Sequence, residues 1–314
     1  MNSYNVETLS PQVINRAFWN KLEDGRIKEA ADEGSGFIRT RMREDSFQRR
    51  IIVPKQIDET EIDRDEDNDF PKVVIDKEPD SVASFLPFMG TAKQKLFTGK
   101  RYAAYFGKVE SQRNTMSKFQ LLTYRYDVRK VLSDNCVKDM AAEEDRVFLK
   151  TINDYITTPL VGVTADYEVD LTAADHGISN RGIKKLLQKM DSKELPVGKL
   201  LLAKSTFREI LEYESFNVSE AVMQRIFEQG VDTETVIFGV PVVVTVKESL
   251  FTKVGGVVQH CYLFTTEEFF GKSFLLQDAT LYLEKRADML EFWAYEAIAT
   301  GIGSFNGAIR GVLA

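Results

Sequence analysis

The sequence feature that most constrains the fold is a continuous amphipathic stretch over residues 133–157. Its apolar residues recur at intervals of three and four, which places them on one face of an α-helix. The side chain of Ser133 or Asp134 can cap the first turn, and Pro159 cannot continue the helix. At about 1.5 Å per residue the helix would be roughly 35 Å long, enough to cross a small domain. The apolar face comprises Val137, Met140, Ala141, Val147, Phe148, Ile152, Tyr155 and Ile156.

The composition is that of an ordinary soluble protein. Of the 314 residues, 43% are hydrophobic and 28% are charged, and no apolar run approaches the length of about 18 residues that spans a membrane. The N-terminus lacks the basic and apolar regions of a secretory signal. Two cysteines are too few for a disulfide framework and favour a reduced, cytoplasmic protein. The net charge of -7 argues against nucleic-acid binding by the whole molecule, and two histidines leave little material for metal or general-base chemistry.

The N-terminal region, residues 1–44, is predicted to be an arm. Ser10 and Pro11 open a first helix, and Gly34 and Gly36 are expected to end it and to act as a hinge. Such a hinge would make the arm separable from the body of the subunit. A basic stretch spans the end of the arm and the start of the next region, and its members are Arg39, Arg41, Arg43, Arg49 and Arg50.

Residues 45–128 are predicted to be an extended region with little core of its own. Residues 51–53 look like a strand, and residues 58–69 hold eight acids and one arginine, a density of like charge that favours a solvated loop. Further strands are expected over residues 101–110 and 119–128. Because so few periodic apolar segments would be unusual inside a compact domain, we expect this region to pack against something other than its own domain.

The C-terminal half alternates helices with apolar strands, which predicts an α/β lobe over residues 159–272. Residues 273–314 then contain two strand-like runs joined by a charged turn, and such a pair needs a covering helix. The long helix is the best candidate, with Val147 and Phe148 packing on the strands near Leu281 and Phe292. The lobe is expected to contain helices 179–190, 205–214 and 217–229 and strands 199–203, 235–246 and 257–264.

No motif forms a catalytic constellation. Gly271-Lys272-Ser273 imitates a phosphate-binding loop, but the required glycine is replaced by Thr266, so a turn before a strand is preferred. Residues 301–307 imitate a dinucleotide fingerprint with no helix after it, and we predict a flexible terminal strand instead. The neighbouring pair His260 and Cys261 reads as packed side chains rather than a nucleophilic site.

The charged segments have more than one interpretation. Aspartates 63, 65, 67 and 69 alternate as in calcium loops, but the glycine and the closing glutamate of those loops are missing. The arginine stretch could contact phosphates, although a solvated or intersubunit face is favoured. The candidate intersubunit residues are Arg39, Arg41, Arg43, Arg49, Arg50, Asp63, Asp65 and Asp67.

The order of these segments resembles the major capsid proteins of tailed bacteriophages, whose Hong Kong 97 fold is shared with encapsulins. The resemblance covers nearly the whole chain from about Arg41 onward and is diffuse. It implies an α+β fold with an arm (1–44), an extended loop region (45–128), a spine helix (129–158), an axial domain (159–272) and returning peripheral strands (273–314). The similar stretches are LLTYRYDVRKVLSDN (121–135), AAEEDRVFL (141–149), FGVPVVVT (238–245) and LYLEKRADMLEFWAYEAIATG (281–301).

The resemblance implies a structural role without cofactors or substrate turnover. The chain would assemble as pentamers and hexamers into an icosahedral virion capsid around double-stranded DNA, in the cytoplasm of the bacterial host. Portal, scaffolding or decoration proteins would be its other partners, with no membrane. No lysine–asparagine crosslinking pair can be matched, so that chemistry is not carried over. The alternatives are an encapsulin-like compartment shell, a soluble α/β enzyme and a nucleic-acid-binding module.

Overall fold

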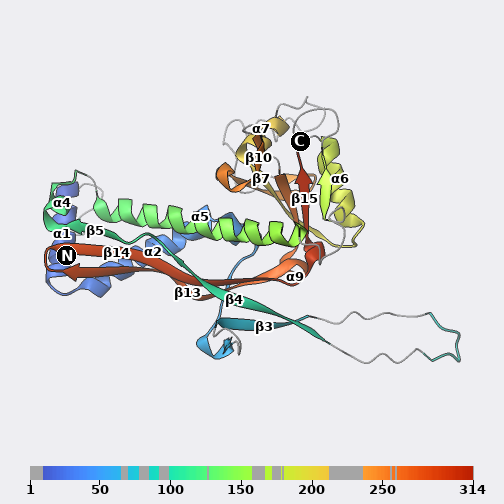
Figure 1. Ribbon diagram of the computed structural model, residues 1–314, viewed down its shortest axis with the longest axis horizontal. Helices are drawn as coiled ribbons and strands as arrows, with labels where there is room; N and C mark the ends of the chain where they lie inside the picture. Colours follow the sequence, from blue (N-terminus) through green and yellow to red (C-terminus); the bar gives the residue numbers. More distant parts are fainter. Residues whose placement is uncertain are drawn as a thin grey trace, which may run out of the picture.

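The computed structural model has an elongated part built along one long helix and a second, smaller lobe at one end of it (Figure 1). We call the elongated part, with its seven-stranded sheet, the peripheral domain, and the lobe with the six-stranded sheet the axial domain. The structure describes residues 10–64, 70–77, 85–91, 99–125, 127–157, 167–171, 178, 180–211, 236–254, 257–258 and 260–313.

The long helix, α5, spans Val128–Thr157 and confirms the predicted spine. It begins earlier than predicted, because its cap comes from a distant residue: the side-chain Oδ1 of Asn15 accepts a hydrogen bond from the Val128 amide at 3.1 Å. Ser133, one of the two predicted caps, lies buried inside the helix. Since Asn15 is also fully buried, the start of α5 is fixed by tertiary structure.

The N-terminal region is part of the peripheral domain and contains three helices, α1 (Pro11–Glu23), α2 (Ile27–Asp45) and α3 (Phe47–Ile51). The predicted stop and hinge at Gly34 and Gly36 are wrong, because both glycines lie within α2. The break falls instead at Gly25, whose φ of 77° suits glycine. A Cβ on Gly34 would lie 2.4 Å from Leu281 Cδ2, so this glycine allows α2 to approach the sheet closely.

The strand predicted over residues 51–53 is also wrong. Ile51 ends the short helix α3, and Ser46 caps that helix by accepting a hydrogen bond from the Arg49 amide at 3.4 Å.

The peripheral sheet is built on the predicted pair of long strands, β13 (Gly271–Arg286) and β14 (Met289–Ile302), which run antiparallel. The sheet order is β1-β13-β14-β4-β3-β2, with β5 also paired to β14. Two helices cover the inner face: Ile38 and Met42 of α2 join Val137 and Met140 of α5 in one apolar cluster over the strands. The remaining strands are β1 (Lys55–Gln56), β2 (Asp63–Arg64), β3 (Pro71–Lys77), β4 (Lys100–Glu110) and β5 (Asn114–Ser117).

The segment after β5 is a helix and not the predicted strand. Helix α4 (Lys118–Thr123) starts with a capping box, in which the Ser117 side chain accepts from the Gln120 amide and the Gln120 side chain accepts from the Ser117 amide. Leu121 of this helix is fully buried against α1. The predicted strand over 101–110 is confirmed as β4, which pairs with β3 to form an extended hairpin.

The axial domain is a six-stranded mixed sheet of order β6-β15-β12-β7-β9-β8. Residues 301–307, predicted to be a flexible terminal strand, instead contain the end of β14 and a 3₁₀ turn over Phe305–Gly307, so that prediction is wrong. The C-terminal strand β15 follows them and lies between β6 and β12 with most of its residues buried. The predicted helix 217–229 lies outside the described residues. The other axial elements are β6 (Glu168–Asp170), α6 (Asn180–Asp191), β7 (Val197–Ala203), α7 (Lys204–Leu211), β8 (Val236–Ile237), β9 (Val240–Thr245), β10 (Lys253–Val254), β11 (Val257–Val258), β12 (His260–Thr265), α9 (Glu267–Phe270) and β15 (Ala308–Val312).

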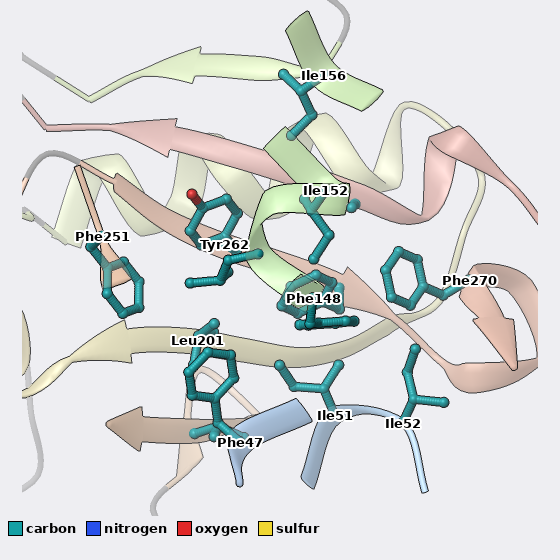
Figure 2. Close-up of a cluster of buried hydrophobic side chains, with 14 of the residues drawn as sticks. Phe47, Ile51, Ile52, Phe148, Ile152, Ile156, Leu201, Phe251, Tyr262 and Phe270 are labelled. Carbon is teal, nitrogen blue, oxygen red and sulfur yellow. The ribbon is translucent and has the colours of Figure 1, made fainter. Parts of the chain in front are cut away.

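The two domains share a core at the C-terminal end of α5 (Figure 2). The Phe148 ring lies 6.4 Å from that of Phe47 on α3, 5.9 Å from Phe264 on β12 and 6.3 Å from Phe270 on α9, between ring centroids. The prediction that Phe148 packs near Leu281 and Phe292 is therefore wrong, since it joins the spine to the axial domain. Val147, predicted to be buried, is 47% exposed because it faces away from this cluster.

Candidate functional site

The most unusual polar feature is a buried cluster of charges around Arg49 of α3. The guanidinium Nε lies 3.0 Å from Glu144 Oε1 and 3.1 Å from Oε2, while Nη2 donates to Glu296 Oε2. Arg49 is 5% exposed, Glu144 2% and Glu296 0%. Asp278 Oδ1 lies 3.9 Å from Nη1, at the edge of the group. One cation therefore faces two fully buried glutamates, from α5 and β14, with a third carboxylate nearby.

This imbalance favours a bound proton. Burial raises the pKa of Glu144 to about 8, opposed by the charge of Arg49 and assisted by those of Glu296 and Asp145. Burial likewise raises the pKa of Glu296, again against the pull of Arg49. Burial alone would lower the pKa of Arg49, but its two glutamate partners raise it above the usual value. The Oε1 atom of Glu296 is buried with no hydrogen-bond partner, which also fits an excess of acceptors over donors.

A second, partly buried ion pair adjoins the first and reaches the axial domain. Lys247 Nζ lies 2.6 Å from Asp145 Oδ2. The other carboxylate oxygen of Asp145 accepts hydrogen bonds from Ser46 Oγ at 2.9 Å and from the Gln48 amide at 3.0 Å. Burial raises the pKa of Asp145 while Lys247 and the hydrogen bonds oppose it. We call these two groups together the α3 junction, comprising Ser46, Arg49, Glu144, Asp145, Lys247 and Glu296.

The junction corrects one sequence prediction outright. Arg49 was expected on a solvated or intersubunit face, but it is buried inside its own chain because Glu144 and Glu296 accept hydrogen bonds from its guanidinium group there. Arg39 is exposed but makes contacts within its own chain. Its Nε donates a hydrogen bond to the Ala279 carbonyl at 3.0 Å and lies 3.7 Å from Asp278 Oδ2. Arg50 is partly buried, and its carbonyl accepts a hydrogen bond from Lys199.

The remaining candidate intersubunit residues do not belong to the α3 junction. Asp63 is exposed on β2. Asp65 and Asp67 lie outside the described residues, and so do the side chains of Arg41 and Arg43, whose backbones belong to α2. The structure does not bring the basic and acidic candidates together within one described surface.

The pair His260 and Cys261 is packed, as predicted. Cys261 is fully buried, and burial raises the pKa of its thiol to about 12, which disfavours the nucleophilic thiolate. Within the described part of the chain, no group of three His, Cys, Asp or Glu side chains is placed to hold a metal ion. None of the described helices has the length and apolarity that crossing a membrane requires.

Comparison with known proteins gives one clear result. No family model and no curated protein matches the chain. Solved structures do match at low identity. The mature capsid of bacteriophage PhiM1 is similar with a TM-score of 0.56 and 8% identity over 85% of this chain and 87% of that one. A virus-like particle from Pyrococcus furiosus gives 0.55 and 13% over 90% and 99%, and the capsid of cyanophage P-SCSP1u gives 0.53 and 12% over 77% and 83%.

The chain has the Hong Kong 97-type capsid fold. The matches span most of both chains, so the fold includes the spine helix, the returning strands and the axial sheet together. Within this capsid fold the α3 junction lies where the N-terminal helices, the spine and the axial domain meet.

Sequence reasoning missed the buried acids of the junction, although a signal was present. Glu144 stands four residues after Met140 and four before Phe148, on the apolar face of the spine helix. Glu296 alternates with Ala294 and Ile298, which face the core from β14. An acid at an apolar position of a regular pattern predicts a buried charge that needs a partner, and Arg49 is that partner.

Proposed function

We propose that the chain is the major capsid protein of a tailed double-stranded DNA bacteriophage, assembling as pentamers and hexamers into an icosahedral shell around the genome. The observation that carries the proposal is the extensive structural match to phage capsid chains, which covers 83% and 87% of the lengths of the two phage structures above. On this proposal the work of the protein is self-association, without substrate turnover or a cofactor.

The shape of the subunit supports this function. The segment described between β3 and β4, residues 85–91, lies far from the spine helix and the axial domain (Figure 1), and all of it except the half-buried Leu86 is solvent-exposed. An exposed apolar segment such as this one gains stability when a neighbouring copy covers it.

Charged surface residues are proposed to tune assembly. Arg39, Arg41, Arg43 and Arg50 on the basic side and Asp63, Asp65 and Asp67 on the acidic side would make contacts between subunits. Exposed pairs contribute only about 0–1 kcal/mol each and are screened by salt, so their effect would be on the salt dependence of assembly. The packaged DNA would be contacted non-specifically, and portal, scaffolding and decoration proteins would be further partners in the host cytoplasm and the virion.

The test is assembly of the purified chain. We expect closed shells or ring-shaped capsomers in negative-stain microscopy and a fast-sedimenting species whose amount depends on concentration and salt. Monomers alone, at every concentration and ionic strength tried, would refute the proposal.

A compartment shell is the second candidate, favoured by the similarity to the Pyrococcus furiosus virus-like particle, of which 99% is covered. The two functions differ in cargo. Shells isolated from the native source should contain double-stranded DNA on the first proposal and a packaged protein on the second, which nuclease protection and mass spectrometry distinguish.

A further inference from the structure

Helix α6 of the axial domain carries cations on its exposed side. Four lysines and arginines precede its one acid, in a chain whose net charge is -7. Arg181 and Lys184 are exposed and Lys185 is partly exposed, and within the described part of the chain none of the three makes an ion pair. Exposed cations of the peripheral domain are often paired instead, as in Arg101 Nε, which lies 2.7 Å from Asp76 Oδ1. The positive charge of α6 is therefore available to a partner.

An exposed aromatic side chain lies beside these cations. Phe238, in the turn between β8 and β9, is 46% exposed, and its ring centroid lies 5.6 Å from Lys184 Nζ. Its φ of 51° is a left-handed value that a bulky residue rarely adopts, so the turn presents this ring at a conformational cost. Val236 of β8 is exposed as well. We call Arg181, Lys184, Lys185, Val236 and Phe238 the basic face. Charged residues around an exposed apolar centre are the arrangement found at protein interfaces.

A segment of opposite charge lies on the peripheral domain. Residues 58–63 contain no cation, and their four acids are exposed and make no ion pair within the described residues. Two of these acids lie in the short 3₁₀ helix η2 (Glu59–Glu61). Phe70, which is 57% exposed, lies beside the segment because the next residue, Pro71, pairs with Arg64. The acidic face, as we call it, comprises Asp58, Glu59, Glu61, Asp63 and Phe70.

The two faces cannot meet within one subunit. Figure 1 shows α6 on the axial domain, whereas the light-blue segment that includes η2 lies below β3 and β4, on the other side of the long strands from the spine helix. A contact between the faces therefore joins two copies. Because the two faces differ, this contact is heterologous and can continue around a ring.

We propose that the basic face of one copy docks on the acidic face of a neighbouring copy. This inference rests on the proposed function and names the partner of the acidic segment. Complementary charges select which surfaces meet and speed their association, and the exposed rings exclude water at the centre of the contact. The occupant is a second copy because the same chain carries both faces. Nucleic-acid phosphates account for the basic face alone and leave the four acids without a partner.

Charge reversal tests the contact directly. Arg181→Glu with Lys184→Glu, and separately Glu59→Lys with Glu61→Lys, should each raise the protein concentration needed for assembly by at least about tenfold at low salt, because attractions become repulsions. The variant with all four changes restores opposite charges with exchanged signs, and it should assemble at close to the wild-type concentration. At about 1 M salt, where the screening length is about 3 Å, the differences should disappear.

A matched control separates a specific contact from an effect of net charge. Lys138 and Lys150 are exposed on α5, outside both faces. Lys138→Glu with Lys150→Glu changes the net charge by the same amount as reversal of the two α6 cations. Combined with the reversed acidic face, this control pair restores the wild-type net charge but should not restore assembly.

Thermal unfolding of the dilute, unassembled variants shows whether each one folds. If reversal of the α6 cations prevents folding, Arg181→Gln with Lys184→Gln removes the charges without adding acids. This neutral pair should shift the assembly concentration in the same direction by a smaller factor.

The outcomes separate this inference from the proposed function. Unchanged assembly of the reversed variants, or no recovery when all four changes are combined, would overturn the contact and leave the capsid proposal standing. Equal recovery with the control pair would attribute the effect to net charge and would also overturn it. A reversed α6 that assembles normally but no longer binds a short DNA duplex at low salt would assign the basic face to phosphates instead. If the wild-type chain forms only monomers, both proposals fail.

Discussion

Replacing Arg49 by methionine should destabilise the subunit strongly, and more so as the pH rises. The substitution keeps most of the side-chain volume and leaves Glu144 and Glu296 buried without a cation. Breaking a buried ion pair in this way typically costs about 3–5 kcal/mol. The protein can limit this cost by protonating both glutamates, which becomes harder at higher pH.

The sign and size of the pH effect follow from the raised pKa of Glu144. In the unfolded chain this carboxyl has a pKa near 4.5, whereas in the folded chain its pKa is about 8. Between these two pH values the folded state holds a proton that the unfolded state does not. The stabilisation that this proton provides is therefore complete below the unfolded pKa and is lost as the pH rises towards 8. Each retained proton contributes a slope of at most about 1.4 kcal/mol per pH unit.

The most informative window runs from about pH 6.5 to about pH 8. His260 has a pKa that burial lowers, and its effect on stability is confined to pH values below about 6.5, where the unfolded chain takes up the proton. Within the window the wild type should lose about 1–2 kcal/mol of unfolding free energy through Glu144. Over the same window the Arg49→Met variant should lose about 2 kcal/mol more unfolding free energy than the wild type. Without Arg49 both glutamates hold protons in the folded state, so two protons contribute to the pH slope in place of one.

The assay is urea unfolding of dilute, unassembled subunits, followed by tryptophan fluorescence at several pH values. Arg39→Met is the matched control, since Arg39 is exposed and lies near the same Asp278, and it should cost less than about 1 kcal/mol with an unchanged pH slope. Glu296→Gln should make the slope shallower, because one of the charges that raise the pKa of Glu144 is removed. An Arg49→Met destabilisation that stays constant or shrinks with rising pH would show that the glutamates are not protonated as argued.

Three further outcomes are expected. Phe148→Ala should cost about 3–5 kcal/mol and loosen both domains in limited proteolysis, and a loss below about 1 kcal/mol would argue against the shared core. Asn15→Ala should cost about 1 kcal/mol and speed hydrogen exchange at the Val128 amide, whereas unchanged exchange there would mean that the cap is dispensable. Deleting residues 10–45 should unfold the peripheral domain, which circular dichroism would detect as a loss of secondary structure. A deletion variant as stable as the full chain would support the predicted separable arm.

Elements with a strong local pattern could be predicted from sequence. The spine helix α5, the paired strands β13 and β14, and the axial elements α6 and β7 all follow from regular apolar spacing within one segment. The order of these elements along the chain indicated the fold, because the capsid fold is defined by its topology more than by any single residue.

The errors fall where tertiary contacts override local preference. Gly34 and Gly36 would weaken an isolated helix, but packing on Leu281 makes a small residue at position 34 necessary and keeps α2 continuous. Residues 118–123 contain aromatic and β-branched types, yet the Ser117 capping box and the burial of Leu121 favour a helix. The burial of Arg49 depends on partners that are 95 and 247 positions away, which no local pattern reveals.

The spine helix is held at both ends by residues of the N-terminal region. Asn15 of α1 caps its first turn, and Phe47 of α3 packs on Phe148 near its other end, beside the Arg49–Glu144 pair. The N-terminal helices therefore fix the position of the axial domain relative to the peripheral domain.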